Sequence, residues 1–464
     1  MKLKAPRGLF TTLLIHLRNP SSLWGASFQL IIAQGIGFLT LLILDLWLVR
    51  QLSQTDFGIW KQFIWMVRFI IPLFYFGLPD SYRYFSAVDK NQYNKHFYNI
   101  LNLIIINGFL WIGLERIHLL DYLVLLTKNS VFSQILWLIP LLMMFSAIKF
   151  LFRIHAIFLK NPQKIVSANS IFSIILIFVC IIMVQSRENF LLILGVGWLI
   201  AEIIRILYYS FQYLSTLSLP AKWYKITYKQ IKKYLKYGIP YYFSSTIFLI
   251  FTNVDKMIVS MLGGAEKFAV FSIAAIEIPF LTSVFVSVSQ NLFPRLAEVN
   301  KTNPQTAFKL WFSVFKKISY LIYPILIVLI WIAKPIFVFL FTEKYSSGVV
   351  IFKIYIFLLI WRTASYSILL NASGRPQVNL LLNSIFLCLN FIGSYVLYQY
   401  YGMTGVVWST LVSFSLLNIS ILIYLRQFGQ FLKLIKGDKI LLSLMITLIL
   451  SFIGSLKFGR LIGL

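Results

Sequence analysis

The chain has 464 residues, of which 59% are hydrophobic and only 12% are charged, so it has far more apolar surface than the core of a water-soluble protein could bury. A formal net charge of +28 would favour nucleic-acid binding in a soluble protein. The basic residues here are separated by apolar runs of bilayer length, which argues against a nucleic-acid partner and predicts an all-α polytopic membrane protein.

Residues 1–24 place basic side chains such as Lys4 and Arg7 around a short apolar stretch. A signal peptide is the alternative, but His16 and Arg18 interrupt the stretch and no small-residue cleavage site follows it. We therefore expect an amphipathic segment on the cytoplasmic side, at the membrane interface.

Apolar runs of about 20 residues, the length that crosses a bilayer, then recur with short polar gaps. They predict 12 to 14 transmembrane helices, of which thirteen can be placed: 25–48, 59–79, 97–115, 131–157, 165–186, 189–213, 237–262, 268–293, 318–341, 348–370, 377–399, 403–425 and 440–456.

Most Lys and Arg residues fall at the ends of spans that lie on the same side as the N-terminus. This bias predicts a multi-pass membrane protein with its N-terminus in the cytoplasm. The largest cluster lies between the sixth and seventh spans, where we expect it to anchor the chain near anionic lipid: Lys222, Lys225, Lys229, Lys232, Lys233 and Lys236.

Several short patterns occur twice. The polar elbow around Asp45 recurs around Asp255, about 210 residues later, which is the signature of an internal duplication. Other residues recur at a similar shift: Pro162, Gln163, Asn169, Ser170, Ile171 and Phe172 as Pro376, Gln377, Asn383, Ser384, Ile385 and Phe386, and Gly195, Val196 and Trp198 as Gly405, Val406 and Trp408.

Six spans separate the copies, so both copies start on the same side of the membrane. We expect two pseudo-symmetric six-helix bundles, residues 25–213 and 237–425, arranged as parallel repeats around a central cavity. A basic cytoplasmic linker, 214–236, would join them, and residues 426–464 would form a basic loop and an extra transmembrane helix.

A charge inside a membrane span costs about 3 kcal/mol on insertion scales, so it needs a wet cavity or a partner. Arg68 and Arg362 lie far from the ends of the second and tenth spans, which favours a cavity-facing role over snorkelling.

Lys149 and Arg153, on one face of the fourth span, lie nearer its cytoplasmic end, so a cavity-facing role and snorkelling both stay open for them. Lys334 lies in the ninth span. In the sixth, Glu202 and Arg205 are three residues apart, and a mutual ion pair is the first interpretation.

Besides Glu202, three acidic residues lie in or beside apolar spans: Asp45, Asp255 and Glu277. Burial raises the pKa of a carboxyl group and would permit coupling to protons. The interpretation we favour for the two aspartates is that they brace the elbows at the outer ends of their spans.

The sequence shows no arrangement of residues that is typical of a catalytic site. The 4 histidines are scattered without metal-ligand spacing, and no nucleophile with a base or nucleotide-binding loop is present. We expect no catalytic residue, no metal and no cofactor.

Several segments together resemble the polysaccharide and oligosaccharide flippases, in the superfamily that also contains multidrug exporters and the lipid II flippase. They are LVRQLSQTDFGIWKQF with FGLPDSYRYFSA, NVDKMIVSMLGGAEKFAVFSIA ending in LFPRLAE, and NASGRPQVNLLLNSI with YGMTGVVWST. The likeness covers about residues 20–430, and the order and spacing of the segments are more specific than any segment alone.

The resemblance implies alternating access and a cargo of undecaprenyl-diphosphate-linked oligosaccharide units, moved to the periplasmic leaflet for O-antigen, capsule or exopolysaccharide synthesis. It also implies a monomer, in contact with membrane lipid and other polysaccharide assembly proteins. Basic cavity residues would hold the diphosphate, since arginine offers a planar fork and lysine a point charge. In order of expectation, the candidates are Arg68 and Arg362, then Arg153, Lys149, Lys256, Lys334 and Arg83.

Three other functions compete with this one. A multidrug exporter would favour an acidic and aromatic cavity for cationic cargo. A lipid II flippase would share the fold. A membrane-bound polymerase or glycosyltransferase would need a large external loop or a cluster of catalytic carboxylates, and neither pattern is found in the sequence.

Overall fold

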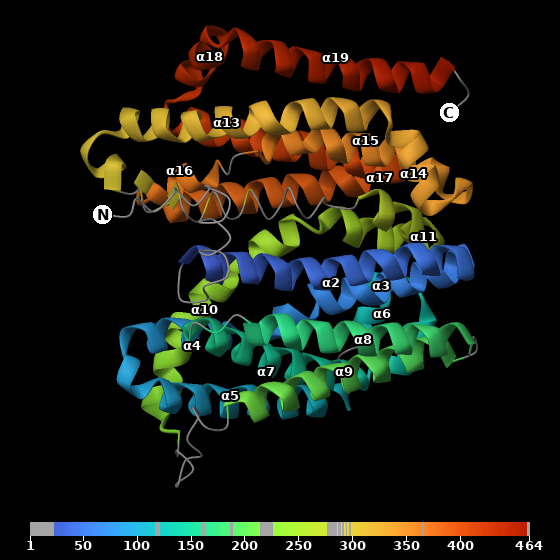
Figure 1. Ribbon diagram of the computed structural model, residues 1–464, viewed down its shortest axis with the longest axis vertical. Coiled ribbons are helices and arrows are strands. Elements are labelled where there is room, and N and C mark those ends of the chain that lie inside the picture. Colours follow the sequence, from blue (N-terminus) through green and yellow to red (C-terminus); the bar gives the residue numbers. More distant parts are fainter. Residues whose placement is uncertain are drawn as a thin grey trace, which may run out of the picture. The chain divides into compact units, whose positions relative to one another are not determined.

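The computed structural model describes residues 23–116, 121–159, 161, 163–185, 189–213, 226–275, 285, 289, 292–293, 295–296, 298–363 and 366–461. Within these residues every regular element is a helix, so the predicted all-α fold is confirmed (Figure 1). Most of the predicted N-terminal segment lies outside the described residues, as do Glu277, Lys222 and Lys225.

Ten helices in the described part of the chain are long and apolar enough to cross a membrane. The predicted spans 377–399 and 403–425 are the two helical arms of α17 (Pro376–Tyr424), which folds back at Gly402 so that Ser409 donates a hydrogen bond to the Asn390 carbonyl oxygen. Gly402 has φ 59° and ψ −142°, a conformation that glycine adopts without the steric penalty of a Cβ atom. The predicted span 268–293 lies largely outside the described residues.

The chain divides into two compact units. The first comprises Met1–Gln51, Phe63–Leu125 and Asn129–Ser245, and the second comprises Leu52–Gln62, Leu126–Lys128 and Thr246–Leu464. Three helices, α3, α6 and α10, therefore each contribute residues to both units.

The helices of unit 1 include α2 (Leu23–Gln51), α3 (Gln54–Phe69), α4 (Leu78–Val88), α5 (Tyr93–Glu115), α6 (Tyr122–Thr127), α7 (Leu138–Phe158), α8 (Gln163–Gln185), α9 (Phe190–Tyr213) and the first part of α10 (Tyr228–Phe251), with short 3-10 helices η1 (Ile71–Phe74), η2 (Lys90–Gln92) and η4 (Ser130–Ile135). Helix α8 packs between α2 and α9, and α7 packs against α5 and α9, as Figure 1 shows. Gly197 lets α9 approach α8 closely, because a Cβ atom there would lie 2.5 Å from Val179.

Aromatic side chains of α5, α7 and α9 pack together in the core of unit 1. Phe97 lies 5.1 Å from Phe152 between ring centroids, and Phe152 stacks on Tyr209 at 5.8 Å. Such pairs add about 0.5 to 1.5 kcal/mol each beyond the burial of their surface, so they help to hold these three helices together.

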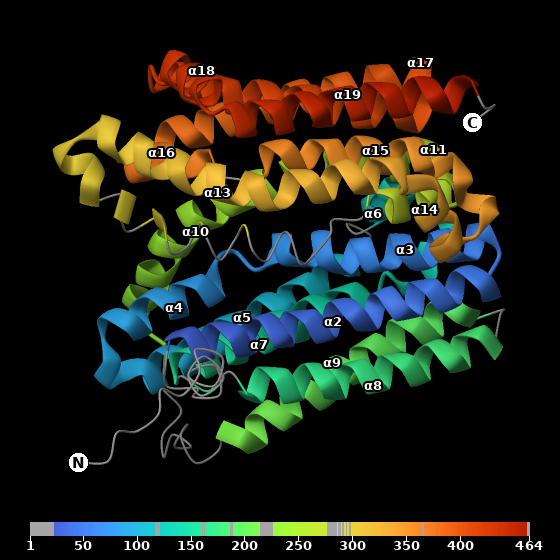
Figure 2. The ribbon, with the colours of Figure 1, turned by 45° about the horizontal axis from the view of Figure 1, so that its top comes forward.

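Unit 2 contains the end of α10, then α11 (Val254–Ala274), α13 (Pro304–Trp331), α14 (Ala333–Phe341), η6 (Glu343–Gly348), α15 (Val349–Leu358), η7 (Leu359–Trp361), α16 (Ser367–Ala372), α17, α18 (Phe428–Gly437) and α19 (Lys439–Leu461). Helix α17 packs on α11 and α15, and α13 packs on α15 and α19 (Figure 2). The start of α3 also belongs here: Gly58 leaves no room for a Cβ atom against the carbonyl oxygen of Ala265.

Candidate functional site

The second predicted span is broken just beyond Arg68. Helix α3 ends at Phe69, the 3-10 helix η1 follows, and α4 starts only at Leu78. The expectation of one continuous helix over 59–79 is therefore wrong. Pro72 removes a backbone donor at the start of η1, and Gly77, with φ 67°, caps α4 in the left-handed region. The Arg68 side chain is exposed and lies within electrostatic range of Asp45 on α2.

The tenth predicted span is broken at its arginine in the same way. Arg362 follows η7 directly as its C-terminal cap, and α16 starts at Ser367. The continuous helix expected over 348–370 is thus also incorrect. The guanidinium carbon of the half-buried Arg362 lies 5.4 Å from the ring centroid of Phe414, at cation–π distance. Each of the two first-choice arginines therefore lies at an interruption of its span, where backbone groups leave the regular helical pattern.

A cluster of charges connects α7 and α9 inside unit 1. The Lys149 Nζ atom lies 2.9 Å from Oε1 of Glu202, and Nη1 of Arg205 lies 3.5 Å from Oε2 of the same carboxylate. Glu202 and Arg205 are buried, and the Lys149 side chain is 25% exposed. The predicted pair of Glu202 and Arg205 is thus present, but Lys149 shares its carboxylate. The Arg205 guanidinium also covers the ring of Phe172 at 3.9 Å.

Arg153 extends this cluster by one turn of α7. Its Nε atom is buried and makes no hydrogen bond to any described residue. Arg205 and Tyr209 are electrostatic neighbours of Arg153, and so is Arg83 on α4. We call Lys149, Arg153, Glu202 and Arg205 the α7–α9 charge cluster. It holds three cations and one carboxylate, so it carries surplus positive charge.

Arg83 is the outer member of this group of cations. Its side chain is 53% exposed and lies 3.4 Å from Asp80 in the first turn of α4. Burial raises the pKa of the Asp80 carboxyl above its ordinary value, and the charge of Arg83 opposes that rise. Arg83 is therefore accessible and forms an ion pair with Asp80.

Asp255 is part of a different contact, in unit 2. It lies in the first turn of α11, where a carboxylate stabilises the helix dipole, and it accepts a hydrogen bond from the Tyr355 hydroxyl on α15. Lys256 Nζ lies 3.9 Å from its Oδ1 atom. These contacts connect α11 to α15 and favour the bracing role. Asp45 is likewise buried, at 5% exposure.

Lys334 belongs to unit 2, whereas the residues of the α7–α9 charge cluster belong to unit 1. It lines a cavity in unit 2 that also contains Lys353, a residue that the sequence analysis missed. The signal was available, because Lys353 is a charged residue inside the predicted span 348–370. Arg205 was recognised only as the partner of Glu202, because the Lys149–Glu202 contact that completes the cluster spans 53 positions of the chain and leaves no local pattern.

Comparison with known proteins identifies the family. A family model described as polysaccharide biosynthesis protein matches residues 23–300. The chain belongs to this family. No curated protein sequence matches it.

Solved structures confirm the fold of this polysaccharide biosynthesis family member. The inward-closed lipid II flippase MurJ matches with a TM-score of 0.66 at 16% identity, covering 92% of this chain and 98% of MurJ. An inward-facing multidrug resistance MATE transporter of the MOP superfamily matches with a TM-score of 0.63 at 12% identity, covering 87% of this chain and 99% of the transporter. A MOP superfamily transporter from Pyrococcus furiosus, described as having a binding pocket of reverse polarity, gives 0.58 at 13% identity, with coverages of 87% and 95%.

The α7–α9 charge cluster offers the donor groups that suit an anion. Its guanidinium and ammonium groups offer only donors, and Glu202 occupies a minority of them. Among the described residues no group of His, Cys, Asp and Glu side chains could hold a metal ion.

Proposed function

We propose that this protein is a flippase that moves undecaprenyl-diphosphate-linked oligosaccharide units across the membrane by alternating access. The family match and the transporter fold support a role in transport for polysaccharide synthesis. The observation that carries the choice of cargo is the surplus positive charge of the α7–α9 charge cluster. A diphosphate is the part of such a cargo that lipid excludes, and it requires cationic donors.

The same cluster argues against a multidrug exporter for cationic cargo. Such a cargo would meet three positive side chains and a single carboxylate that two of them already contact. Like charges repel strongly where the dielectric constant is low. The net positive charge of the described cluster therefore suits an anionic cargo.

Within the cluster we assign the first contact with the diphosphate to Arg153. Lys149 and Arg205 are held by Glu202, whereas the Nε atom of Arg153 makes no hydrogen bond to a described residue. A charge-assisted hydrogen bond contributes about 1.5 to 3 kcal/mol, so loss of the Arg153 contact should weaken cargo binding by roughly ten- to a hundredfold.

The test measures flipping of a fluorescent undecaprenyl-diphosphate oligosaccharide in proteoliposomes, normalised to the amount of inserted protein. Arg153→Ala should lose most of the rate, and Arg153→Lys should retain an intermediate rate. Arg116, an exposed arginine at the end of α5, provides the matched control, and Arg116→Ala should flip normally. Normal flipping by Arg153→Ala would contradict the assignment. Flipping of lipid II alone by the wild type would show that lipid II, and not an oligosaccharide unit, is the cargo.

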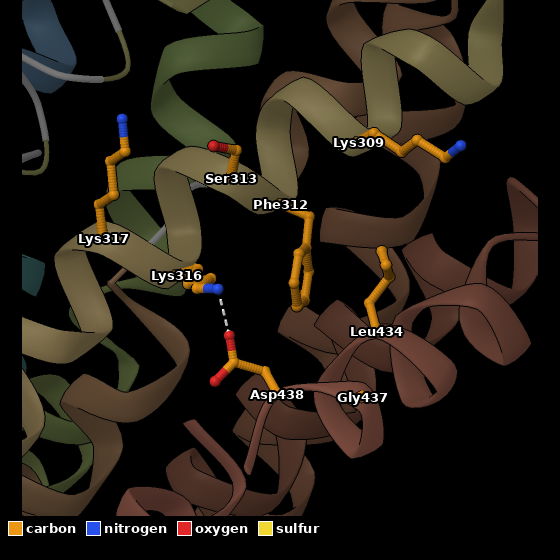
Figure 3. Close-up of a pocket in the computed structure, with 8 residues that line it drawn as sticks. All are labelled: Lys309, Phe312, Ser313, Lys316, Lys317, Leu434, Gly437 and Asp438. Atoms are coloured by element: carbon orange, nitrogen blue, oxygen red, sulfur yellow. Dashed lines mark ion pairs between the residues drawn. The ribbon is translucent and has the colours of Figure 1, made fainter. Parts of the chain in front are cut away.

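We further propose that the N-terminus is cytoplasmic and that the membrane is the bacterial inner membrane. Support comes from unit 2, where the basic first half of α13 lies beside the junction of α18 and α19. Lys309, Lys316 and Lys317 on α13 line a pocket of about 480 Å³ with Asp438 (Figure 3). A basic segment of this kind favours the cytoplasmic side under the positive-inside rule.

A further inference from the structure

A second cavity of unit 2 lies among α14, η6, α15, α17 and α19 and has a volume of about 820 Å³. Lys334 and Lys353 contribute its charges, and none of its lining residues, all within the described chain, is Asp or Glu. Its volume is within the range of about 300 to 1,000 Å³ that is usual for small-molecule sites. The cavity therefore combines room for a ligand with uncompensated positive charge.

Lys353 is the more informative of the two cations. It is the fifth residue of α15 and lies inside a helical segment that is apolar enough to cross the membrane, Glu343–Trp361. Its Nζ atom donates to the carbonyl oxygen of Ser455 on α19 at 3.1 Å. A carbonyl group accepts one of the three ammonium protons but does not neutralise the charge. An ionised lysine at this depth is costly and calls for an anionic partner.

The pocket of Figure 3 shows what a compensated lysine looks like in this protein. There, Lys316 points toward the Asp438 carboxylate and forms an ion pair with it, whereas Lys309 and Lys317 extend away from that carboxylate. The cavity of Lys334 and Lys353 has no equivalent of Asp438. The missing negative charge must come from outside the lining residues.

The walls of the cavity indicate what kind of molecule brings that charge. Trp408 and Phe452 lie 6.0 Å apart between ring centroids, and Phe452 stacks on Phe357 at 4.2 Å. Two lining residues, Tyr401 and Ile453, are 67% and 45% exposed, so the cavity opens onto an apolar outer surface of α17 and α19. Tyr and Trp are typical of the membrane interface. A ligand that fits these walls has an anionic head and an apolar body.

We propose that this cavity binds an acidic phospholipid of the surrounding bilayer. The phosphate of its headgroup would contact Lys334 and Lys353, and its acyl chains would follow the apolar surface of α17 and α19. The C-terminal helix α19 supplies Phe452, Ile453 and Ser455 to the site and is thereby a lipid-binding element. This inference is independent of the cargo proposed above.

The experiment is native mass spectrometry of the full chain, purified and delipidated in detergent, with either phosphatidylglycerol or phosphatidylcholine added. We expect wild type to retain phosphatidylglycerol in preference. The double variant K334Q/K353Q should bind it about a hundredfold more weakly, at about tenfold for each charged contact. The matched control K309Q/K317Q removes the same charge from the pocket of Figure 3 and should bind as wild type does.

Each remaining outcome decides against the proposal. Equal retention of the two lipids would overturn it, and so would an equal loss of binding in K309Q/K317Q, which would show a general effect of charge. Displacement of phosphatidylglycerol by undecaprenyl diphosphate would assign the cavity to the cargo instead. If K334Q/K353Q fails to fold, K334R/K353R replaces it, and loss of phosphatidylglycerol binding in that charge-preserving variant would contradict an electrostatic site.

Discussion

Lys149 and Glu202 join α7 to α9 through a contact of 2.9 Å between Nζ and Oε1, although 53 positions of the chain separate them. Glu202 is 1% exposed at its side chain and also contacts Arg205. This one carboxylate therefore compensates two cations at once, and the third, Arg153, remains available for an anion.

The first prediction concerns Glu202→Gln. Removal of one partner of a buried ion pair leaves an uncompensated buried charge and costs about 3 to 5 kcal/mol. We expect a marked loss of folded protein and a lower melting temperature in detergent, measured by size-exclusion chromatography after heating. Adding Lys149→Met should restore part of the stability, because it removes one of the cations that Glu202 compensates. Unchanged melting of Glu202→Gln would show that the carboxylate is not the counter-charge of the cluster.

The second prediction tests Asp255, in unit 2, as an ion-coupling group. Asp255 accepts a hydrogen bond from Tyr355 and lies beside Lys256, which favours an ionised carboxylate that braces α11. Asp255→Asn should lower stability yet keep the dependence of transport on an imposed proton or sodium gradient. Tyr355→Phe should act in the same direction, since it removes the same contact. Loss of gradient dependence at normal protein level in Asp255→Asn would make Asp255 the coupling site. Asp45→Asn, tested in parallel, applies the same criterion to unit 1.

The sequence predicted the broad features of this fold because they depend on composition and length. Runs of about 20 apolar residues require helices that satisfy their own backbone groups in lipid. The interruption after Arg68 was harder to predict: Pro72 and Gly77 mark it, but Phe76, at φ 48°, carries no such signal. The Arg362 break lies in a stretch without Gly or Pro between Gly348 and Gly374, so only tertiary packing can set it.

The candidate site was predictable only as a set of charges. Spacings of three or four residues place Glu202 beside Arg205 and Lys149 beside Arg153. The meeting of these two pairs depends on the packing of α7 against α9, which no local pattern encodes. Lys353 could have been singled out as a charge inside the predicted span 348–370, but its contact with α19 depends on the packing of α15 near α19.

The third prediction is a pH dependence in unit 2. Burial opposes ionisation of Asp438, but hydrogen bonds from Lys316, the Leu441 amide and Tyr320 prevail and lower its pKa from 3.8 to about 2. A depressed pKa in the folded state means that the stabilising contribution is fully present above about pH 4 and is lost as the pH falls toward 2. Wild type should melt above Asp438→Asn at neutral pH, and the two melting curves should converge near pH 2. A difference that persists at pH 2 would contradict this linkage.

The fourth prediction concerns the turn at Gly402, where α17 folds back on itself. Gly402 has φ 59°, and Gly405, three residues on, would place a Cβ atom 2.3 Å from the Leu397 carbonyl oxygen. A side chain at 402 imposes backbone strain of about 1 to 3 kcal/mol. Gly402→Ala and Gly405→Ala should both reduce the yield of folded protein, whereas Gly429→Ala, where a Cβ atom meets no atom within 4 Å, should not. Normal yields from both variants would mean that the turn of α17 at residue 402 does not require glycine.

The last prediction returns to Arg68 and Arg362, the arginines at the two interrupted spans. If each supplies charge-assisted hydrogen bonds to a diphosphate, its loss should weaken cargo capture by roughly ten- to a hundredfold. Lysine keeps the charge but lacks the planar fork, so Arg→Lys should fall between wild type and Arg→Ala. Arg362→Lys should be the poorer of the two lysine variants, because Arg362 also lies at cation–π distance from Phe414.

The measurement is surface glycan delivered per membrane-inserted molecule for Arg68→Ala, Arg362→Ala and both lysine variants. An arginine with a purely structural role would lower the amount of inserted protein and leave delivery per molecule unchanged. Phe414→Leu separates the two contributions at Arg362, because it removes the aromatic ring and keeps the guanidinium. Normal delivery per molecule in both alanine variants would remove Arg68 and Arg362 from the diphosphate site and leave the α7–α9 charge cluster and Arg83 as the candidates among the described residues of unit 1.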